Sequence, residues 1–468
     1  MTNPSLHGAL ARATDHATQF LAGLETRSVA ATAGPDQLRA RLALPLRDAG
    51  CPADQVIEDL IQATAGGHLG SAGGRFFGWV VGGALPSALA ADWLTSAWDN
   101  NAVTYACAPA AAVAEEVAGG WLKEILGLPT EASFAITTGC QMAHVACLAA
   151  ARNAVLARAG WDVELDGLIG APRIRVLAND QYHGSVSRAL RLLGLGSRAL
   201  EPLATDDTGR LAEATLRAAL AAHDGPTILV LNAADLHLGA CDDFARLIPL
   251  ARAAGAWVHV DGAFGLWARA SRRHRHLVDG VELADSWATD AHKWLNTPKD
   301  GGLAFVRDVA AHRAAFAVNA GYMLSDGMVR DPVDFTPEWT RRARAYPIYA
   351  ALRELGRDGV ADLVDRCCDH ALALARGLAA LPGVQLVAEP TLNQAVVRFP
   401  DPRPEANDAD HDRSCDAMIA AINATGEAFF SGTVFRGRRG MRISVVNWRT
   451  TAADIDRTIA AVNRVLAG

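Results

Sequence analysis

The sequence predicts an α/β fold: a large domain with a mostly parallel sheet, preceded by a helical segment and followed by a small α+β domain. Three observations carry this prediction. Short apolar runs alternate with Ala/Leu-rich helical stretches from residue 61 to residue 344. Amphipathic helical patterns separated by turn signals fill residues 1–60, and the alternation stops near residue 345. Apolar strands that alternate with helices are typical of a parallel sheet covered on both faces.

Within residues 61–344 we expect the following strands: 133–139, 173–180, 227–233, 256–265 and 302–307. The expected helices between some of them are 140–160, 211–224 and 244–255. The strands are nearly continuous apolar runs, and the helices are rich in Ala and Leu. The apolar stretch 76–94 contains Pro86 and paired glycines, so a buried strand, a turn and a helix are expected there rather than a membrane span.

The chain from residue 345 to 468 has a different character. A long helical segment, 346–381, leads into three short apolar runs, 384–390, 394–400 and 442–448, and the chain ends in a helical pattern. Residues 398–416 are polar and contain several prolines, so we expect an exposed surface crossing there. This pattern predicts a small α+β domain.

Composition narrows the class of protein. The chain has 468 residues, of which 50% are hydrophobic and 20% charged, and its formal net charge is −7. That balance indicates a globular protein with a large core, and without a dense basic block no nucleic-acid partner is expected. The first twenty residues lack the pattern of a signal peptide. The eight cysteines match neither a disulfide framework nor a zinc pattern, so we expect reduced thiols, a cytoplasmic protein, no membrane association and no metal.

Two turns follow expected strands and could bind a cofactor. "TTGCQMAH" (137–144) joins a strand to a helix, and the N–H groups and positive dipole of such a helix start suit a phosphate. "NDQYHGSVSRA" (179–189) places His183 just before another helix, where an imidazole could stack on a flat ring. Taken singly, each has an ordinary structural explanation: most such turns bind nothing, and His183 could be a capping or core residue.

An aspartate and a lysine complete the pattern. Asp261 ends the apolar strand "VHVD", where a buried carboxylate needs a cationic partner such as a protonated pyridine nitrogen, or else caps a turn. Lys293 lies between His292 and Trp294 in a chain that is sparing with lysine. Partial burial and nearby positive charge are expected to depress its pKa, which makes the amine nucleophilic towards aldehydes. A surface lysine is the alternative. Together the four features are those that pyridoxal phosphate requires.

From about residue 74 to residue 448 the sequence resembles the group II pyridoxal-phosphate-dependent amino-acid decarboxylases, which include aromatic-amino-acid, histidine and glutamate decarboxylases. The motifs "HVDGAFG" (259–265) and "DAHKWLN" (290–296) carry the resemblance, and "TTGCQMAH" looks like a variant of the family's phosphate turn. The resemblance implies a fold-type I enzyme with a seven-stranded type of sheet, working as a homodimer with its active sites at the interface.

The resemblance also implies roles for individual residues. The implied cofactor-binding residues are Gly139, Cys140, Gln141, His183, Asp261, Ala263, Asp290, His292 and Lys293. The implied catalytic residues are Lys293, which forms the Schiff base, His183, Asp261 and Tyr322. Tyr322 lies in "VNAGYMLSDG" (318–327), where the family has a tyrosine on a mobile loop that protonates the substrate carbon after carbon dioxide leaves.

The expected substrate pocket departs from the family pattern. Its candidate residues are Trp79, Gly82, Asn101, Val103, His237 and Lys299. His237 and Leu238 replace a usual Asn and Thr, Lys299 stands where an aromatic is usual, and Asn101 and Val103 replace larger apolar groups. A cation in a partly desolvated pocket favours an anionic ligand, so a small acidic or strongly polar amino acid is expected. An interface ion pair for Lys299, with an aromatic substrate, is the competing interpretation.

The sequence therefore predicts a decarboxylase that releases carbon dioxide and an amine from an L-amino acid. An aldehyde synthase that combines decarboxylation with oxidative deamination is the first alternative, although Tyr322, typically lost in that branch, is present. An aminotransferase on the same fold is the next alternative. A binding scaffold without a cofactor is disfavoured because both Asp261 and Lys293 are retained.

Overall fold

A computed structural model describes residues 6–222, 224–317 and 330–468. Its residues group into two compact units. The larger unit comprises Gly82–Leu372 and Ala388–Ala395, and the smaller one comprises Met1–Val81, Ala373–Val387 and Val396–Gly468. Within the described residues, no helix is long and apolar enough to cross a membrane.

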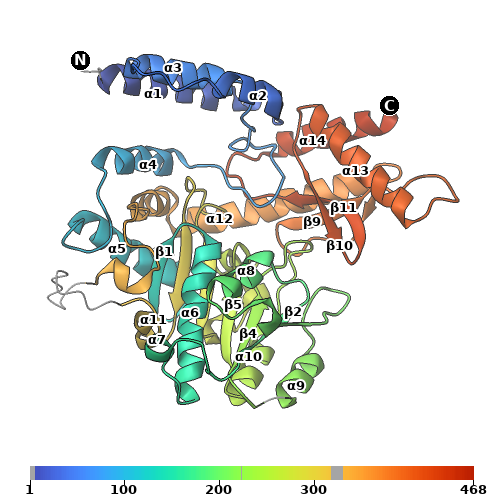
Figure 1. Cartoon of the computed structure of the whole chain (residues 1–468). Coiled ribbons are helices and arrows are strands. Elements are labelled where there is room, and N and C mark those ends of the chain that lie inside the picture. The colour runs from blue at the N-terminus through green and yellow to red at the C-terminus, as the bar shows by residue number, and fades with distance from the viewer. Residues whose placement is uncertain (1–5, 223, 318–329) are drawn as a thin grey trace. The chain divides into compact units, whose positions relative to one another are not determined.

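The larger unit is built on a seven-stranded sheet in the order β1-β7-β6-β5-β4-β2-β3 (Figure 1). Its strands are β1 (Ser133–Thr137), β2 (Arg175–Asn179), β3 (Leu200–Leu203), β4 (Thr227–Asn232), β5 (Trp257–Asp261), β6 (Ser286–Asp290) and β7 (Gly302–Val306). Only β7 runs antiparallel to its neighbours β1 and β6, so the other six strands end at the same edge. The sheet is therefore mostly parallel, as the sequence predicts.

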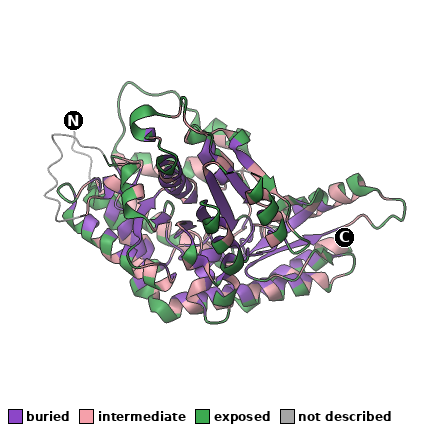
Figure 2. Cartoon of the chain, turned by 90° about the horizontal axis from the view of Figure 1, so that it is seen from below, coloured by how far each residue is buried: buried purple, intermediate pink, exposed green. Residues whose placement is uncertain are grey.

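The larger unit also contains helices. They are α4 (Pro86–Trp98), α5 (Pro109–Ile125), α6 (Cys140–Arg158), α7 (Val163–Asp166), α8 (Gly184–Leu192), α9 (Glu213–Ala221), α10 (Phe244–Ala253), α11 (Val309–Ala314) and the first part of α12 (Ala345–Ala379). Short 3-10 helices span Ser197–Ala199, Gly265–Ala270, Arg275–Val278, Val281–Leu283 and Pro332–Phe335. Helix α6 crosses the sheet and packs on β1, β7, β6, β5 and β4. Figure 2 shows the strands buried and the outer faces of the helices exposed.

The smaller unit has an N-terminal helical part and a four-stranded sheet. The helices are α1 (Leu6–Ala22), α2 (Pro35–Leu42) and α3 (Ala53–Thr64), with a 3-10 turn at Gly23–Glu25. The sheet order is β10-β11-β9-β8, formed by β8 (Gln385–Leu386), β9 (Gln394–Arg398), β10 (Ser431–Phe435) and β11 (Arg438–Ser444). Helices α13 (Asp408–Ala424) and α14 (Ala452–Ala467) pack together, and α13 also lies on β10 and β11.

Two sequence expectations about local structure need correction. Residues 398–416 are not only a surface loop, because α13 begins at Asp408. The Asn407 side chain accepts from the Asp410 N–H while the Asp410 carboxylate accepts from the Asn407 N–H, and this reciprocal cap starts the helix. Residues 76–94 contain the expected helix, α4, but in place of a strand there is only an isolated bridge between Phe76 and Phe429.

Candidate active site

The candidate residues of the larger unit gather at the edge where its parallel strands end. Thr137 ends β1, Asn179 ends β2, Asp261 ends β5 and Asp290 ends β6. In open α/β sheets this edge is where ligands bind, because the loops and helix starts that follow the strands converge there. Ala263 links two of these strand ends: its N–H donates to the Asp261 carboxylate and its carbonyl accepts from the Asp290 N–H.

Lys293 lies in a turn that follows β6 and is held by Asp290. The Lys293 Nζ is 2.9 Å from the Asp290 Oδ2, and 20% of the lysine side chain is exposed. Burial lowers the pKa of Lys293, but the carboxylates of Asp290 and Asp261 outweigh it, so the pKa of this amine is raised. The expected depression of the Lys293 pKa is thus wrong for this arrangement, because the sequence did not reveal how close Asp290 lies.

A second segment packs against the Lys293 turn from behind. A Cβ atom at Gly82 would lie 2.0 Å from the Lys293 carbonyl oxygen, so only glycine fits this contact. The Gly83 N–H donates to the Asn296 Oδ1 and the Leu85 N–H donates to the Asn296 carbonyl, both at 2.8 Å. The structure therefore places Gly82 as a packing contact of the lysine backbone, a role that the sequence reading did not assign to it.

The start of α6 presents several donors at the same edge. Gly139 is the N-cap residue, and the Cys140 N–H donates to the Asp290 Oδ1 at 2.6 Å. The Gln141 Nε2 is buried and has no hydrogen-bond partner. Burial, together with the carboxylates of Asp290 and Asp261, raises the pKa of the Cys140 thiol well above its usual range, so the thiol keeps its proton.

Asp261 is a buried carboxylate that remains ionised. Its side chain is 7% exposed, and its Oδ2 is 3.5 Å from the His144 Nε2. Burial raises the pKa of Asp261, but His144, then His183 and Lys293, lower it further than burial raises it, so the net shift is downward. His144 was not among the residues predicted from the sequence. Its only signal was a histidine four residues after Cys140 on an otherwise apolar face of α6.

His183 is the N-cap of α8, and this position fixes which ring nitrogen carries its proton. The Ser185 N–H donates to the His183 Nδ1 at 3.2 Å. Because a backbone N–H can only donate, Nδ1 is the acceptor and Nε2 carries the proton of the neutral ring. The ring contributes to lowering the pKa of Asp261, which places it in the same electrostatic environment.

His292 and Lys299 are the other two ionisable residues of the 291–299 segment, which contains Lys293. The His292 Nδ1 accepts from the Gly301 N–H at 3.2 Å, and its Nε2 lies 3.7 Å from the Asp290 Oδ1. Burial lowers the pKa of His292, Asp290 opposes this, and the positive charges of Lys293 and Lys299 lower it further. The Lys299 charge thus reaches the residue next to the candidate catalytic lysine.

The other expected pocket residues have local partners. Asn101 accepts a hydrogen bond from the Arg341 N–H, and Val103 is buried, with its carbonyl bound to the Val333 N–H. The His237 N–H donates to the Asp235 carboxylate inside the 234–242 loop. Trp79 belongs to the smaller unit, where it packs on Phe76 and Phe429. Tyr322 falls outside the described residues.

These residues fit pyridoxal phosphate. Lys293 offers an amine that is partly accessible, as an aldehyde-binding lysine must be. Asp261 offers a buried anion that matches a protonated ring nitrogen, and the α6 start offers an unpaired buried donor, the Gln141 Nε2, for a phosphate oxygen. The Gly139 backbone leaves room beside it, since an added Cβ would be 3.4 Å from the nearest atom, the His292 Cε1.

Comparisons with known proteins agree with this assignment. Residues 35–399 match the model of the pyridoxal-dependent decarboxylase conserved domain. The chain is 30% identical to L-2,4-diaminobutyrate decarboxylase of Rhizobium meliloti (strain 1021) over 384 residues, covering 80% of this chain and 74% of that protein. It is 26% identical to the acidic amino acid decarboxylase of Mus musculus over 365 residues, covering 76% of this chain and 65% of that one.

Among solved structures, the fold is similar to that of Oryza sativa TDC with PLP and tryptamine. The TM-score is 0.92 at 24% identity, and the alignment covers 100% of this chain and 99% of the other. This similarity establishes the fold-type I architecture, with the seven-stranded sheet and the small antiparallel sheet. With the family match over residues 35–399, the chain belongs to the pyridoxal-dependent decarboxylases and is an amino-acid decarboxylase whose cofactor is pyridoxal 5'-phosphate.

Proposed function

We propose that this decarboxylase acts on a small acidic or strongly polar amino acid, such as one with a β- or γ-carboxylate, a sulfinate or a phosphonate. The observation that carries the proposal is the environment of Lys299. Burial lowers the pKa of its ammonium group, although the residue as a whole has an exposed surface. Across the described residues, no carboxylate lies within ion-pair distance of Lys299. A substrate anion would supply the missing charge.

Lys299 is one of only three lysines in the chain, with Lys123 and Lys293. Lys293 is paired with Asp290, and Lys123 donates to the backbone carbonyls of Thr130 and Ala132. The Asn101 side chain accepts from the Arg341 N–H, and the His237 N–H donates to Asp235 within its own loop. Both therefore support the proposal less than Lys299 does. The relative named for acidic amino acids fits an anionic substrate, whereas diaminobutyrate carries a second amine and the rice structure contains an aromatic amine.

We assign the chemistry to the residues at the strand edge. Lys293 would hold the cofactor through its aldehyde and would be displaced there by the substrate amine. Bound pyridoxal phosphate supplies the electron sink for the pair left behind when the bond from Cα to the carboxylate breaks. Asp261 would keep the ring nitrogen protonated. His183, with its proton on Nε2, would stack on the ring and donate to the substrate carboxylate.

We further assign the protonation of Cα to Tyr322, on the basis of the family resemblance alone. Replacing Tyr322 with Phe would remove this proton donor, so Cα would stay unprotonated long enough to react with oxygen. The expected products then include an aldehyde, ammonia and hydrogen peroxide beside the amine. Mass spectrometry that finds only amine, formed at the parent rate, would exclude this role for Tyr322 and leave the product assignment of the parent enzyme intact.

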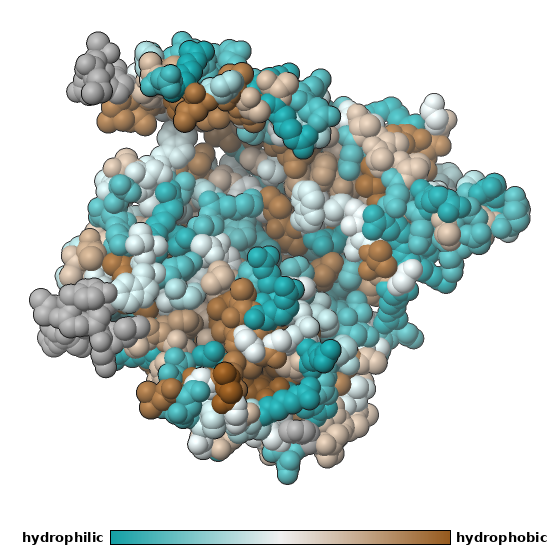
Figure 3. Space-filling model, in the orientation of Figure 1, coloured by the Kyte–Doolittle hydropathy of each residue, from teal (hydrophilic) through white to brown (hydrophobic). Residues whose placement is uncertain are grey.

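A homodimer is part of the proposal. Figure 3 shows hydrophobic surface on the N-terminal helical part. The large apolar residues exposed on this part are Leu6, Leu10, Leu42, Leu44, Leu46, Val56 and Leu60. A patch of this kind on an isolated chain marks a surface that another protein covers. Sedimentation equilibrium that finds a monomer at micromolar concentration would contradict the dimer.

The substrate proposal is tested by comparing kcat/KM for aspartate or glutamate with kcat/KM for tryptophan. The parent enzyme should prefer the acidic substrate, and Lys299→Met should reduce that preference at least about tenfold while leaving the aromatic value unchanged. Lys123→Met is the matched control, because it removes another partly buried lysine. A parent that prefers the aromatic substrate, and keeps the preference in Lys299→Met, would overturn the proposal. Weaker dimerisation of that variant would then identify an interface ion pair.

A further inference from the structure

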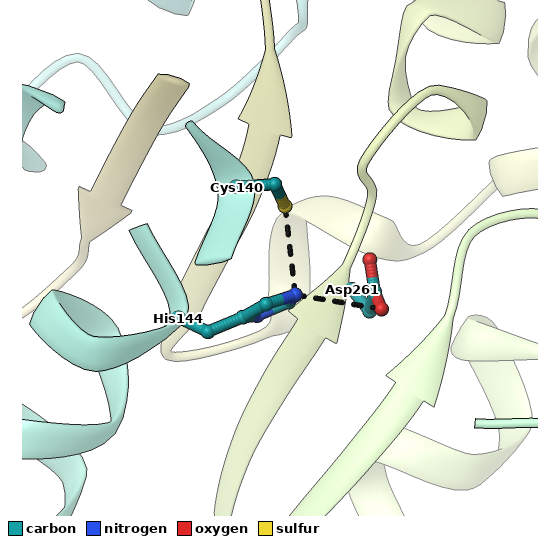
Figure 4. Close-up of side chains that lie close together, drawn as sticks. All are labelled: Cys140, His144 and Asp261. Atoms are coloured by element: carbon teal, nitrogen blue, oxygen red, sulfur yellow. Dashed lines mark hydrogen bonds and ion pairs between the residues drawn. The ribbon is translucent and has the colours of Figure 1, made fainter. Parts of the chain in front are cut away.

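A row of buried polar side chains runs from Asp261 into the core of the larger unit. The His144 Nε2 lies 3.5 Å from both the Asp261 Oδ2 and the Cys140 Sγ, and Figure 4 shows the ring directed at these two groups. On its other side, the His144 Nδ1 is 2.9 Å from the His259 Nε2. Neither histidine has any exposed surface. None of the roles assigned above uses them.

The row continues beyond His259 to a tryptophan. The His259 Nδ1 is 3.0 Å from the Ser286 Oγ, and the Trp257 Nε1 donates to the same oxygen at 2.9 Å. His259 and Trp257 come from β5 and Ser286 from β6, so the sheet itself holds this end of the row. The five side chains thus join the candidate cofactor site to the centre of the sheet.

The carboxylate end of the row determines the direction of the hydrogen bonds between neutral rings. An ionised carboxylate can only accept, so a neutral His144 that faces Asp261 with its Nε2–H has Nδ1 free to accept. The proton of His259 then lies on Nε2, and its Nδ1 accepts from the Ser286 hydroxyl. The His259 Nε2–H donates to the His144 Nδ1. Burial lowers the pKa of His259 to about 3, which agrees with a neutral ring that has one N–H.

We propose that His144 is a positioning residue that holds Asp261 ionised and oriented towards the cofactor ring nitrogen, and that the hydrogen bond from the His259 Nε2 to the His144 Nδ1 fixes its tautomer. The role of His144 is indirect: it acts on the ring nitrogen through Asp261. The proposed role of His144 depends on the cofactor and not on the substrate. A test of this role can therefore fail without affecting the acidic-substrate proposal.

The same atoms could be considered as a metal site. One ligand atom each from Cys140, His144 and Asp261 lies within 4.8 Å of the others. A thiol binds metal as the thiolate, and the pKa of Cys140 is raised well above its usual range, so this thiol is a poor ligand. A metal would also occupy the carboxylate that the ring nitrogen needs. We therefore interpret the His144 Nε2 as a hydrogen-bond donor to Asp261 and not as a metal ligand.

The experiment compares two forms of the cofactor in the full-length protein, stripped and then reloaded. One is pyridoxal phosphate, and the other is its 1-deaza analogue, in which carbon replaces the ring nitrogen. The parent should bind pyridoxal phosphate more tightly than the analogue. His144→Met should reduce that ratio of dissociation constants about tenfold or more, because it removes a hydrogen bond to a charged group.

Two further variants separate positioning from general structure. His144→Gln keeps an amide N–H near the position of Nε2, so it should retain the parent ratio within about threefold. His312→Gln replaces another fully buried histidine, which lies on α11 and is hydrogen-bonded to Ser133 on β1. This variant should leave the ratio of dissociation constants unchanged. If His144→Met weakens the binding of both cofactors equally, the role is structural and the proposal is wrong.

The tautomer of His144 can be measured in the parent protein, without a substitution that destabilises the fold. Nitrogen-15 NMR of histidine-labelled parent protein, with His144→Gln used for assignment, reports which ring nitrogen is protonated. A His144 signal with the proton on Nε2 supports the proposal. A neutral ring with the proton on Nδ1 would overturn it, even if His144→Met does not fold.

Discussion

The region around Asp261 is fixed by contacts within the sheet, whereas the region around Lys299 is an exposed loop. Asp261 ends a buried strand, and its carboxylate contacts His144 and the Ala263 N–H, so its position is fixed by the sheet. Lys299 is an exposed residue in a loop, and no described carboxylate pairs with it. The chemistry common to the family thus depends on residues fixed by backbone packing. In the proposed function, substrate choice depends on Lys299, whose charge has no carboxylate partner among the described residues.

The largest expected effect is at the fixed region. Lys293→Ala should abolish turnover, because without this amine the cofactor aldehyde has no protein partner to exchange with the substrate. The protein should still fold, since the lysine side chain contributes only its ion pair with Asp290. Carbon dioxide release and circular dichroism measure the two properties. Steady-state turnover at the parent rate would refute the assignment, and Lys123→Ala controls for the loss of a lysine.

Asp261→Ala should have the next largest effect. A neutral pyridine is a poorer electron sink, and losing a preorganised charge at such a site typically costs about 10²–10³-fold in rate. The relevant measurement is kcat for the best substrate at saturating cofactor. A loss of less than about tenfold, or about 1.4 kcal/mol, would mean that Asp261 serves the structure and not the reaction.

Gly82→Ala tests how firmly the Lys293 turn is held from behind. The new Cβ would overlap the Lys293 carbonyl, so the turn or the 82–85 segment must shift. Overpacking of this kind costs about 1–3 kcal/mol, and a misplaced lysine lowers turnover as well. Gly120→Ala is the control, because nothing lies within 4 Å of its added Cβ and it lies within helix α5. Equal melting temperatures and activities in the two variants would show that the 82–85 segment does not hold the Lys293 turn in place.

The sequence predicted the fixed region well because that region is made of apolar strands. The runs that became β1, β2, β4, β5 and β7 are continuous apolar segments followed by turn residues. Strand β6, "SWATD", is fully buried but contains Ser, Thr and Asp, so its composition gave no strand signal. Strand β3, "LEPL", contains a proline and lies at the sheet edge, where proline is tolerated.

What the sequence could not show were pairings between residues distant in the chain. Asp290 binds both the Lys293 amine and the Cys140 N–H, which reverses the expected direction of the lysine pKa shift. His144 and His259 are 115 residues apart and meet only because α6 crosses β5. A buried histidine on an alanine-rich helix face was the available signal, but without its partner it could not be told from a core residue.

The smallest expected effect is on the pH dependence of stability, and it comes from buried histidines inside and outside the cofactor region. His259 belongs to the row under Asp261, whereas His312 lies on α11 and binds the Ser133 hydroxyl. Burial lowers the pKa of both to about 3, and the charge of Arg330 adds to the shift at His312. In the unfolded chain a histidine titrates near 6.5.

These values give the sign of a pH effect on stability. Below about pH 6.5 the unfolded chain takes up a proton that each buried ring refuses, so the free energy of unfolding falls as the pH falls towards 3. Between pH 7 and pH 5 each histidine should contribute a loss of up to about 2 kcal/mol. Asp242, whose pKa burial raises to about 6, has the opposite effect, because its stabilising contribution is lost as the pH rises through 6.

Comparing variants cancels the contribution of Asp242. His312→Asn can keep a hydrogen bond to Ser133, because its amide takes the place of Nδ1, and it removes one titrating ring. Its free energy of unfolding should therefore change less between pH 7 and pH 5, by up to about 2 kcal/mol. Urea unfolding at the two pH values, followed by tryptophan fluorescence, measures this difference. An identical pH dependence in parent and variant would show that His312 titrates normally in the folded protein.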